Sequence, residues 1–194
     1  MPWEKSFDVD EALDRAANVF WMKGFEATSM SDLIKGMGIN KGSLYNAFGS
    51  KKELFKRVLI KFEEDHQKPA LQQLRDIDDP IKSISTLYDW VIAQSMADKE
   101  KKGNLIINTA LEMPNHDEDI REIVKSAINR LERFFREMVD LGKERGSIPD
   151  HIDPDEAAKS LVSLTVGVRV LARGAYDTNG LLAIKNNALR LIGN

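Results

Sequence analysis

Residues 29–52 read SMSDLIKGMGINKGSLYNAFGSKK, which predicts two short helices joined by a tight turn. Ser29 and Asp32 have the spacing of a capping box at the start of the first helix, and Gly38 suits its end. Four apolar residues recur at the spacing that places side chains on one helix face, namely Met30, Leu33, Ile34 and Met37. This helix is amphipathic, so it must pack against other helices.

The second helix of the pair is predicted to begin at Lys41, with Asn40 as its N-cap. Leu44 and Phe48 stand one turn apart and can face the core. The outward residues carry groups that suit phosphates and base edges, namely Lys41, Ser43, Tyr45 and Asn46. Two short helices joined in this way are typical of a helix-turn-helix, whose second helix enters the major groove of DNA.

A further helix begins directly after this pair, with Ser50 as N-cap and Glu53 at the third helical position. Lys51 and Lys52 therefore lie in its first turn, where their positive charges oppose the helix dipole. This placement is easier to understand if a DNA phosphate binds at the helix end, because the free N–H groups and the lysines would then act on one anion together. Thr28 could also contact a phosphate, although a hydroxyl beside a cap more often bonds the local backbone. The predicted DNA contacts are Thr28, Lys41, Gly42, Ser43, Tyr45, Asn46, Lys51 and Lys52.

Positive charge is concentrated around these helices. Residues 35–61 contain seven lysines and arginines and one acidic residue, a net charge of +6, whereas the whole chain carries −3. The remainder of the chain therefore carries −9. Most charge runs are solvated helix faces, but the coincidence with a helix-turn-helix favours contact with phosphates.

Residues 25–59 resemble the DNA-binding domain of the TetR family of transcriptional repressors, over the run FEATSMSDLIKGMGINKGSLYNAFGSKKELFKRVL. The most specific positions are Leu44, Tyr45, Phe48, Lys51, Lys52 and Leu54. The resemblance implies a dimer that binds a palindromic operator and is released when a small molecule enters the helical body and shifts the fourth helix. Residues 103–128 also resemble the body of one TetR subgroup, in which the position of Asn104 is often cysteine. Asparagine at this position removes a thiol-based sensing mechanism.

The remainder of the chain predicts helices and no strands. A first helix is predicted from Asp8 to Gly24, and a long fourth helix from about Lys51 towards Leu74, with a kink or break near Pro69. Further helices are predicted over residues 80–97 and 105–113, from Asn115 as N-cap to residue 146, and over residues 154–174 and 178–192. The predicted fold is all-α with about nine helices, in a helix-turn-helix domain over residues 1–50 and a larger helical body over residues 51–194.

Composition excludes several classes of protein and site. The 194 residues contain no cysteine, which excludes disulfides and thiolate metal sites within the chain. There is no run of 18 apolar residues and the N-terminus is too polar for a signal peptide, so we expect a cytoplasmic protein with no membrane partner.

His66 and His116 lack a second histidine one turn away, which favours solvated helix surface over a metal site. No pattern marks a nucleophile, and neither a cofactor nor an enzymatic activity is predicted.

The body helices carry the candidates for a ligand site and a subunit interface. Ligand sites between bundle helices are mainly apolar with a few polar groups, which predicts lining by Phe62, His66, Trp90, Asn108, Leu111, Phe134 and Met138. Helix-turn-helix proteins usually bind as two-fold dimers, so the apolar seam near the C-terminus predicts an interface of Leu161, Leu164, Val168, Leu171, Ile184, Ala188 and Leu191. Ordinary core packing is the alternative for the apolar residues in both sets.

These patterns together predict a ligand-responsive, DNA-binding transcriptional regulator. Its predicted partners are a double-stranded DNA operator, a small-molecule effector and a second copy of the chain, and its predicted output is repression. One alternative is a helical-bundle enzyme or ligand carrier whose head is only a structural cap, but such a protein has no need for the +6 region on a helix-turn-helix. A second alternative retains DNA binding and dispenses with a ligand.

Overall fold

The computed structural model describes residues 7–193, and the first six residues of the predicted head lie outside this range. The described residues form helices and no strands, which confirms the predicted fold class. The α-helices are α1 (Val9–Lys23), α2 (Met30–Met37), α3 (Lys41–Phe48), α4 (Lys51–Phe62), α5 (Lys68–Arg75), α6 (Pro80–Ala97), α7 (Leu105–Leu111), α8 (Glu118–Glu144), α9 (Pro154–Leu171) and α10 (Thr178–Leu191). A π-helical turn, η1 (Glu63–Gln67), joins α4 to α5. Residues 7–193 therefore contain nine helices when α4, η1 and α5 are counted as one and the single 3-10 turn at residues 113–115 is left aside.

Side-chain caps fix the starts of the head helices where the sequence predicts them. The carboxylate of Asp8 accepts backbone N–H bonds at the start of α1, and the side chain of Asn40 accepts from the N–H of Ser43 at 2.8 Å. Ser29 and Asp32 form the predicted capping box at the start of α2. Gly38 ends α2 in the left-handed conformation at φ 69°, which glycine adopts without steric cost. The helix-turn-helix is therefore defined by local chemistry.

The long fourth helix changes character where the sequence predicts a kink. A regular α-helix cannot continue through Pro69, because its ring removes an N–H donor and crowds the carbonyl one turn earlier. The chain widens into the π-helical turn η1 immediately before this point and resumes as α5, which has Pro69 in its first turn. Single π turns of this kind often occur at functional sites.

One predicted helix boundary is wrong. Asn115 is not the N-cap of α8, because residues 113–115 form a short 3-10 turn after α7, labelled η2 (Met113–Asn115). The N-cap is Asp117, whose side chain accepts the N–H of Ile120 at 3.3 Å. Acidic residues follow in the first turn of α8 and complement the helix dipole.

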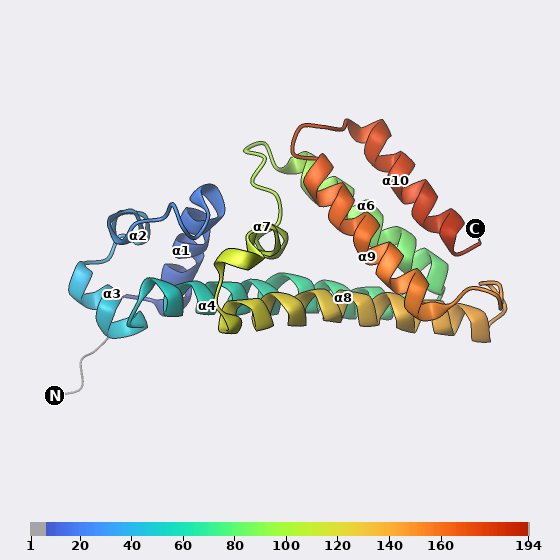
Figure 1. The fold of residues 1–194 in the computed structure, drawn as a ribbon, viewed down its shortest axis with the longest axis horizontal. Coiled ribbons are helices and arrows are strands. Elements are labelled where there is room, and N and C mark those ends of the chain that lie inside the picture. The colour runs from blue at the N-terminus through green and yellow to red at the C-terminus, as the bar shows by residue number, and fades with distance from the viewer. Residues whose placement is uncertain (1–6, 194) are drawn as a thin grey trace.

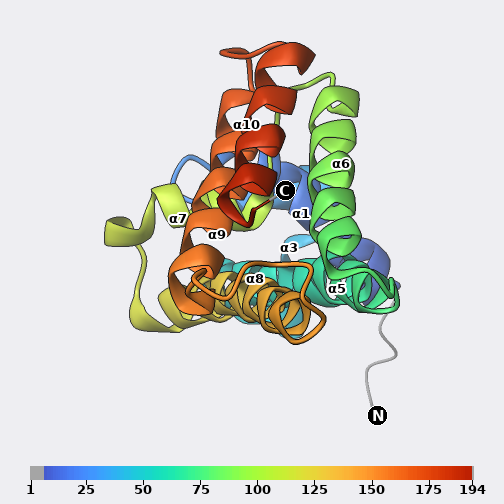
Figure 2. The ribbon, with the colours of Figure 1, turned by 90° about the vertical axis from the view of Figure 1, so that its right-hand side faces the viewer.

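Two apolar cores organise the molecule. The head core consists of α1 to α4 together with residues of α7 and the first half of α8, including Leu105 and Val124. The body core consists of α5, α6, the second half of α8, α9 and α10. Figures 1 and 2 show α4, α5 and α8 forming one layer, with α6, α9 and α10 packed above it. The continuous helix α4–η1–α5 and helix α8 thus connect the two cores physically. No helix within residues 7–193 has the length and apolar character needed to cross a membrane.

His116 is buried, and the prediction of a solvated helix surface is wrong for this residue; His66 is exposed as predicted. The imidazole of His116 lies against the rings of Phe25 and Phe55, at centroid distances of 5.5 and 6.0 Å. Neither ring nitrogen has a hydrogen-bond partner in the described part of the chain. The η2 turn places this imidazole over the head core. The acidic residues that follow His116 in the sequence suggested a solvated surface and gave no sign of this burial.

We expect His116 to make the protein less stable in mild acid. Burial lowers the pKa of His116 below its ordinary 6.5, although Glu112, Glu26 and Asp117 oppose this effect. The unfolded chain therefore binds the proton first, so the free energy of unfolding should fall as the pH drops below about 6.5. His116→Phe should lose less stability than the unmodified protein between pH 7.5 and 5.5 in denaturant titrations. The exposed His66→Phe serves as the matched control, and identical pH profiles for all three proteins would contradict the expectation.

Candidate nucleic-acid interface and ligand cavity

Helix α3 presents a polar surface beside the apolar face that packs on the head core. Leu44 and Phe48 are buried in that core, as the sequence predicts. Lys41, Gly42 and Asn46 are exposed, and Tyr45 exposes 42% of its surface. The exposed groups are an ammonium, a phenol and an amide on a helix of eight residues. Such groups on the second helix of a helix-turn-helix are suited to reading base edges in a major groove.

Two of the predicted DNA contacts do not lie on this surface. Ser43 is buried, because position 43 faces the core beside Leu44. Thr28 is also buried, and its hydroxyl donates to the carbonyl of Gly24 at 2.6 Å. Neither residue therefore belongs to the exposed surface of the helix-turn-helix, and for Thr28 the local backbone bond is the observed role.

Lys51 and Lys52 lie in the first turn of α4, as predicted, but both are engaged within the protein. The ammonium of Lys51 donates to the carbonyls of Phe25 and Thr28, at 2.9 and 3.0 Å, and lies over the Phe25 ring. This contact ties α4 to the turn between α1 and α2. Lys51 therefore braces the helix-turn-helix, a role that its position in the sequence does not reveal.

The ammonium of Lys52 pairs with two carboxylates at the start of α8. Its nitrogen lies 2.6 Å from Asp117 and 3.4 Å from Asp119, and Lys56 joins the same cluster at 3.0 Å from Asp119. The hydrogen bond with Lys52 lowers the pKa of Asp117 and raises that of Lys52, so both groups are charged at neutral pH. We call Lys52, Lys56, Asp117 and Asp119 the junction cluster. It neutralises part of the positive charge that the sequence places beside the helix-turn-helix.

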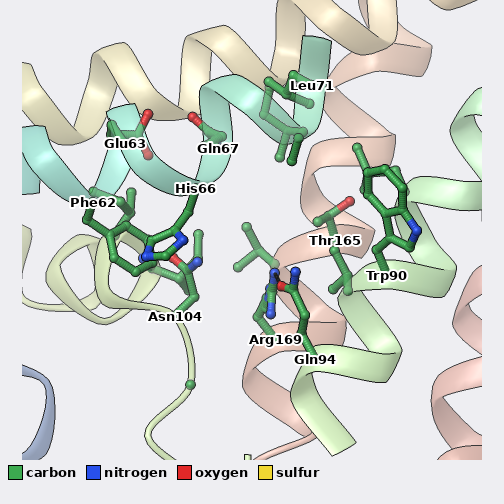
Figure 3. A pocket seen from close by; sticks show the side chains of 18 of the residues that line it. Phe62, Glu63, His66, Gln67, Leu71, Trp90, Gln94, Asn104, Thr165 and Arg169 are labelled. Carbon is green, nitrogen blue, oxygen red and sulfur yellow. Dashed lines mark hydrogen bonds between the residues drawn. The ribbon is translucent and has the colours of Figure 1, made fainter. Parts of the chain in front are cut away.

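A cavity of about 510 Å³ lies within the body, between α4–η1–α5, α6, the start of α7, α8 and α9. Its walls are mainly apolar, formed by residues such as Leu71, Leu87, Trp90, Val91 and Leu131. Figure 3 shows polar groups entering it at separate places, with Arg169 and Gln94 together and His66 near Asn104. The volume falls in the range of ~300–1,000 Å³ that is usual for small-molecule sites.

Three of the seven residues predicted for a ligand site line this cavity, namely Phe62, His66 and Trp90. The other four do not line it. Phe134 and Met138 are buried in the body core, and Leu111 exposes 61% of its surface to solvent. The side chain of Asn108 bonds to the carbonyl of Lys102 and to Arg173. Helical spacing identifies an inward face but not which inward residue borders a cavity, so these four assignments are corrected.

The charged residues of the cavity were not predicted from the sequence. Glu63, in the π-helical turn, is buried, and burial raises its pKa, although the nearby Arg130 opposes this effect. Arg169 borders the cavity from the last turn of α9. A usable signal existed for Arg169, because it is the one charged residue in the run LVSLTVGVRVLA over residues 161–172.

The predicted interface residues divide into two groups. Leu161, Val168 and Ala188 are fully buried within the protomer, so they belong to its own core and cannot supply an outer face. The remaining four are only partly buried, namely Leu164, Leu171, Ile184 and Leu191.

The four partly buried residues share one side of α9 and α10. On α9, Leu164, Gly167 and Leu171 stand at i, i+3 and i+7, and Ile184, Asn187 and Leu191 repeat this spacing on α10. The opposite sides of the two helices face α6, since Arg169 bonds to Gln94 and Lys185 pairs with Asp89. We call Leu164, Gly167, Leu171, Ile184, Asn187 and Leu191 the outer face. A Cβ added to Gly167 would have no atom within 4 Å, so the centre of this face is open in the protomer.

Comparisons with known proteins agree with this architecture. Residues 12–58 match the family described as bacterial regulatory proteins, tetR family, and residues 80–183 match the tetracyclin repressor-like C-terminal domain. The HTH-type transcriptional repressor ComR of Escherichia coli is 31% identical over 188 residues, covering 96% of this chain and 90% of ComR.

Solved structures show the same fold. A cysteine mutant of the TetR family regulator CifR, complexed with 26-base-pair operator DNA, superposes with a TM-score of 0.85 at 29% identity, over 97% of this chain and 98% of CifR. Reduced NemR of E. coli superposes with a TM-score of 0.86 over 95% of this chain and 96% of NemR, and at 19% identity this likeness concerns the fold alone. The chain belongs to the TetR family of helix-turn-helix transcriptional regulators, and it is a DNA-binding regulator rather than an enzyme.

Proposed function

We propose that the protein is a dimeric repressor that binds a palindromic operator through α3 and is released when a small molecule occupies the body cavity. The observation that carries this proposal is the path of the helix α4–η1–α5. Its first turn braces the helix-turn-helix through Lys51, and its π-helical turn and α5 form one wall of the cavity. A ligand that displaces this wall would move the same helix that holds the DNA-binding surface.

The binding equilibria set a quantitative condition on this mechanism. A ligand can release the operator only if it binds the DNA-incompetent conformation more tightly, and operator DNA must weaken ligand binding by the same factor.

Selection of bound sequences from a random duplex pool tests the proposal that the protein binds a palindromic operator. Recovery of a palindrome would support a dimeric repressor, and recovery of no preferred sequence would contradict it.

Base readout should depend on the exposed residues of α3. We expect Lys41→Ala and Tyr45→Ala each to cost about 1–3 kcal/mol on the selected operator and much less on unrelated duplexes, if they contact base edges. Lys35→Ala is the matched control, because Lys35 is exposed on the neighbouring helix α2. This control should weaken binding to all duplexes about equally. Binding titrations on the operator and a scrambled duplex measure both effects, and uniform losses for all three variants would show that the readout lies elsewhere.

A further inference from the structure

Arg169 places a cation at the edge of a largely apolar cavity. Its guanidinium donates a hydrogen bond to the Oε1 atom of Gln94 on α6 at 2.7 Å. No carboxylate oxygen of residues 7–193 lies within the 4.0 Å of an ion pair with it. A guanidinium has five N–H donors in a planar fork, so several remain for another partner. Figure 3 shows Arg169 and Gln94 side by side, facing the open space of the cavity.

The charge on Arg169 persists despite its surroundings. Burial lowers the pKa of Arg169 to about 10, and the more distant carboxylate of Asp98 opposes this shift. The group is therefore cationic at neutral pH. Arg169 is only partly accessible to solvent. A partly desolvated charge without a close counter-ion is unfavourable, and an anion brought into the cavity would offset that cost.

The remaining walls of the cavity determine the chemical character of the rest of the ligand. Its lining is dominated by aliphatic and aromatic side chains, including Leu71, Leu74, Leu87, Trp90, Val91, Ile107, Leu131 and Val162. Burial of apolar ligand surface against such walls is favourable by about 25 cal/mol per Å². The complementary molecule has an extended apolar body with a charged group at one end.

We propose that the cavity binds a hydrophobic monocarboxylate, whose carboxylate pairs with Arg169 and Gln94 and whose apolar body lies against the aliphatic walls. The inference rests on the proposed function of the cavity as the sensor site and specifies its ligand class. The two oxygens of a carboxylate match two parallel N–H groups of a guanidinium, which fixes the orientation of the ligand as well as its charge.

The charges around the cavity favour one negative charge over two. Asp98 and Glu63 also border the cavity, and the carboxylate of Asp98 is held by the backbone N–H of Gly103 at 2.8 Å. Lys102, another lining residue, pairs with Glu100 at 2.9 Å. At Arg169, a phosphate dianion would meet one guanidinium and the repulsion of the Asp98 carboxylate, which acts on the same site. A monocarboxylate carries a single negative charge, which that one guanidinium can balance.

Calorimetric titration with decanoate and 1-decanol tests the proposal, because the two probes share a chain length and differ at the head group. The unmodified protein should bind decanoate about 10- to 100-fold more tightly than decanol, the range expected for a hydrogen-bonded ion pair. Arg169→Met should lose that preference, with decanol binding unchanged. Arg173→Met is the matched control, because Arg173 bonds to the carbonyl of Lys101 and does not line the cavity. It should bind both probes as the unmodified protein does.

Two further measurements keep the test decisive. If Arg169→Met fails to fold in a thermal melt, Arg169→Lys replaces it, and this variant should show a weakened preference for decanoate because lysine lacks the planar fork. Equal binding of decanoate and decanol by the unmodified protein, or no binding of decanoate, overturns the inference. Operator release is measured separately. Release by decanol alone would refute the carboxylate and leave the sensor function standing, whereas tight decanoate binding without release would support the carboxylate and refute the sensor function.

Discussion

Gly167→Arg is expected to convert the protein into a folded monomer and to lower operator affinity by ~10²- to 10⁴-fold, the loss that follows when two linked binding modules become one. Gly167 lies at the centre of the outer face, where an added side chain meets no atom of its own protomer. The substitution should therefore leave the fold of each subunit intact. In a dimer that packs α9 and α10 against a second copy, the same side chain would bring a bulky charge into a desolvated apolar seam.

The measurements must separate association from folding. Sedimentation velocity gives the oligomeric state, circular dichroism gives the helix content, and a titration gives the operator affinity on the same preparation. Ser126→Arg is the control, because Ser126 is exposed on α8 and away from the outer face. A Gly167→Arg protein that remains dimeric would place the subunit interface on another surface.

Phe134→Ala is expected to destabilise the protein by about 3–5 kcal/mol, which is typical of the truncation of a buried aromatic side chain. Phe134 has no exposed surface, contacts Phe135 and lies within the body core rather than at the cavity. The loss should appear in the free energy of unfolding from a denaturant titration. At temperatures where the variant stays folded, ligand-driven operator release should be unchanged.

Trp90→Ala provides the contrasting variant, since Trp90 is only partly buried and lines the cavity. We expect a smaller loss of stability and an altered ligand affinity, because the substitution enlarges an existing space and removes an aromatic wall. If Phe134→Ala changed ligand release while Trp90→Ala did not, the cavity described above would not be the sensor site.

Local features of this fold follow from the sequence with good precision. The starts of α1, α2, α3, α4, α6 and α9 were predicted because each has a capping side chain whose hydrogen bonds reach only two or three residues along the chain. The predicted start of α8 was wrong because capping signals are local and two nearby residues, Asn115 and Asp117, both suit an N-cap. The 3-10 turn before α8 selects the second of them.

Features that depend on packing between distant segments could not be predicted in this way. Trp90 and Phe134 both occupy inward helical positions, yet only Trp90 reaches the cavity, because that outcome depends on how α6 and α8 meet. The burial of His116 and the pairing of Lys52 with Asp117 also join segments far apart in the sequence. A helical pattern shows which side of a helix is inside, but not which residue of another helix it meets.

The junction cluster changes how the ionic-strength dependence of operator binding should be interpreted. A lysine that has no partner in the protein displaces roughly one condensed cation from the duplex when it contacts a phosphate. The number of such cations sets the slope of the logarithm of operator affinity against the logarithm of salt concentration. Lys52 already holds Asp117 and Asp119, so a phosphate must compete with these carboxylates for the same ammonium. When Lys52 exchanges partners, Asp117 loses its ion pair, while Asp119 keeps Lys56 at 3.0 Å. The exposed carboxylate of Asp117 recruits a cation from solution as the duplex releases one. The slope should therefore indicate fewer phosphate contacts than a count of the lysines near α3 suggests, and each exchange would also loosen α8 from the head.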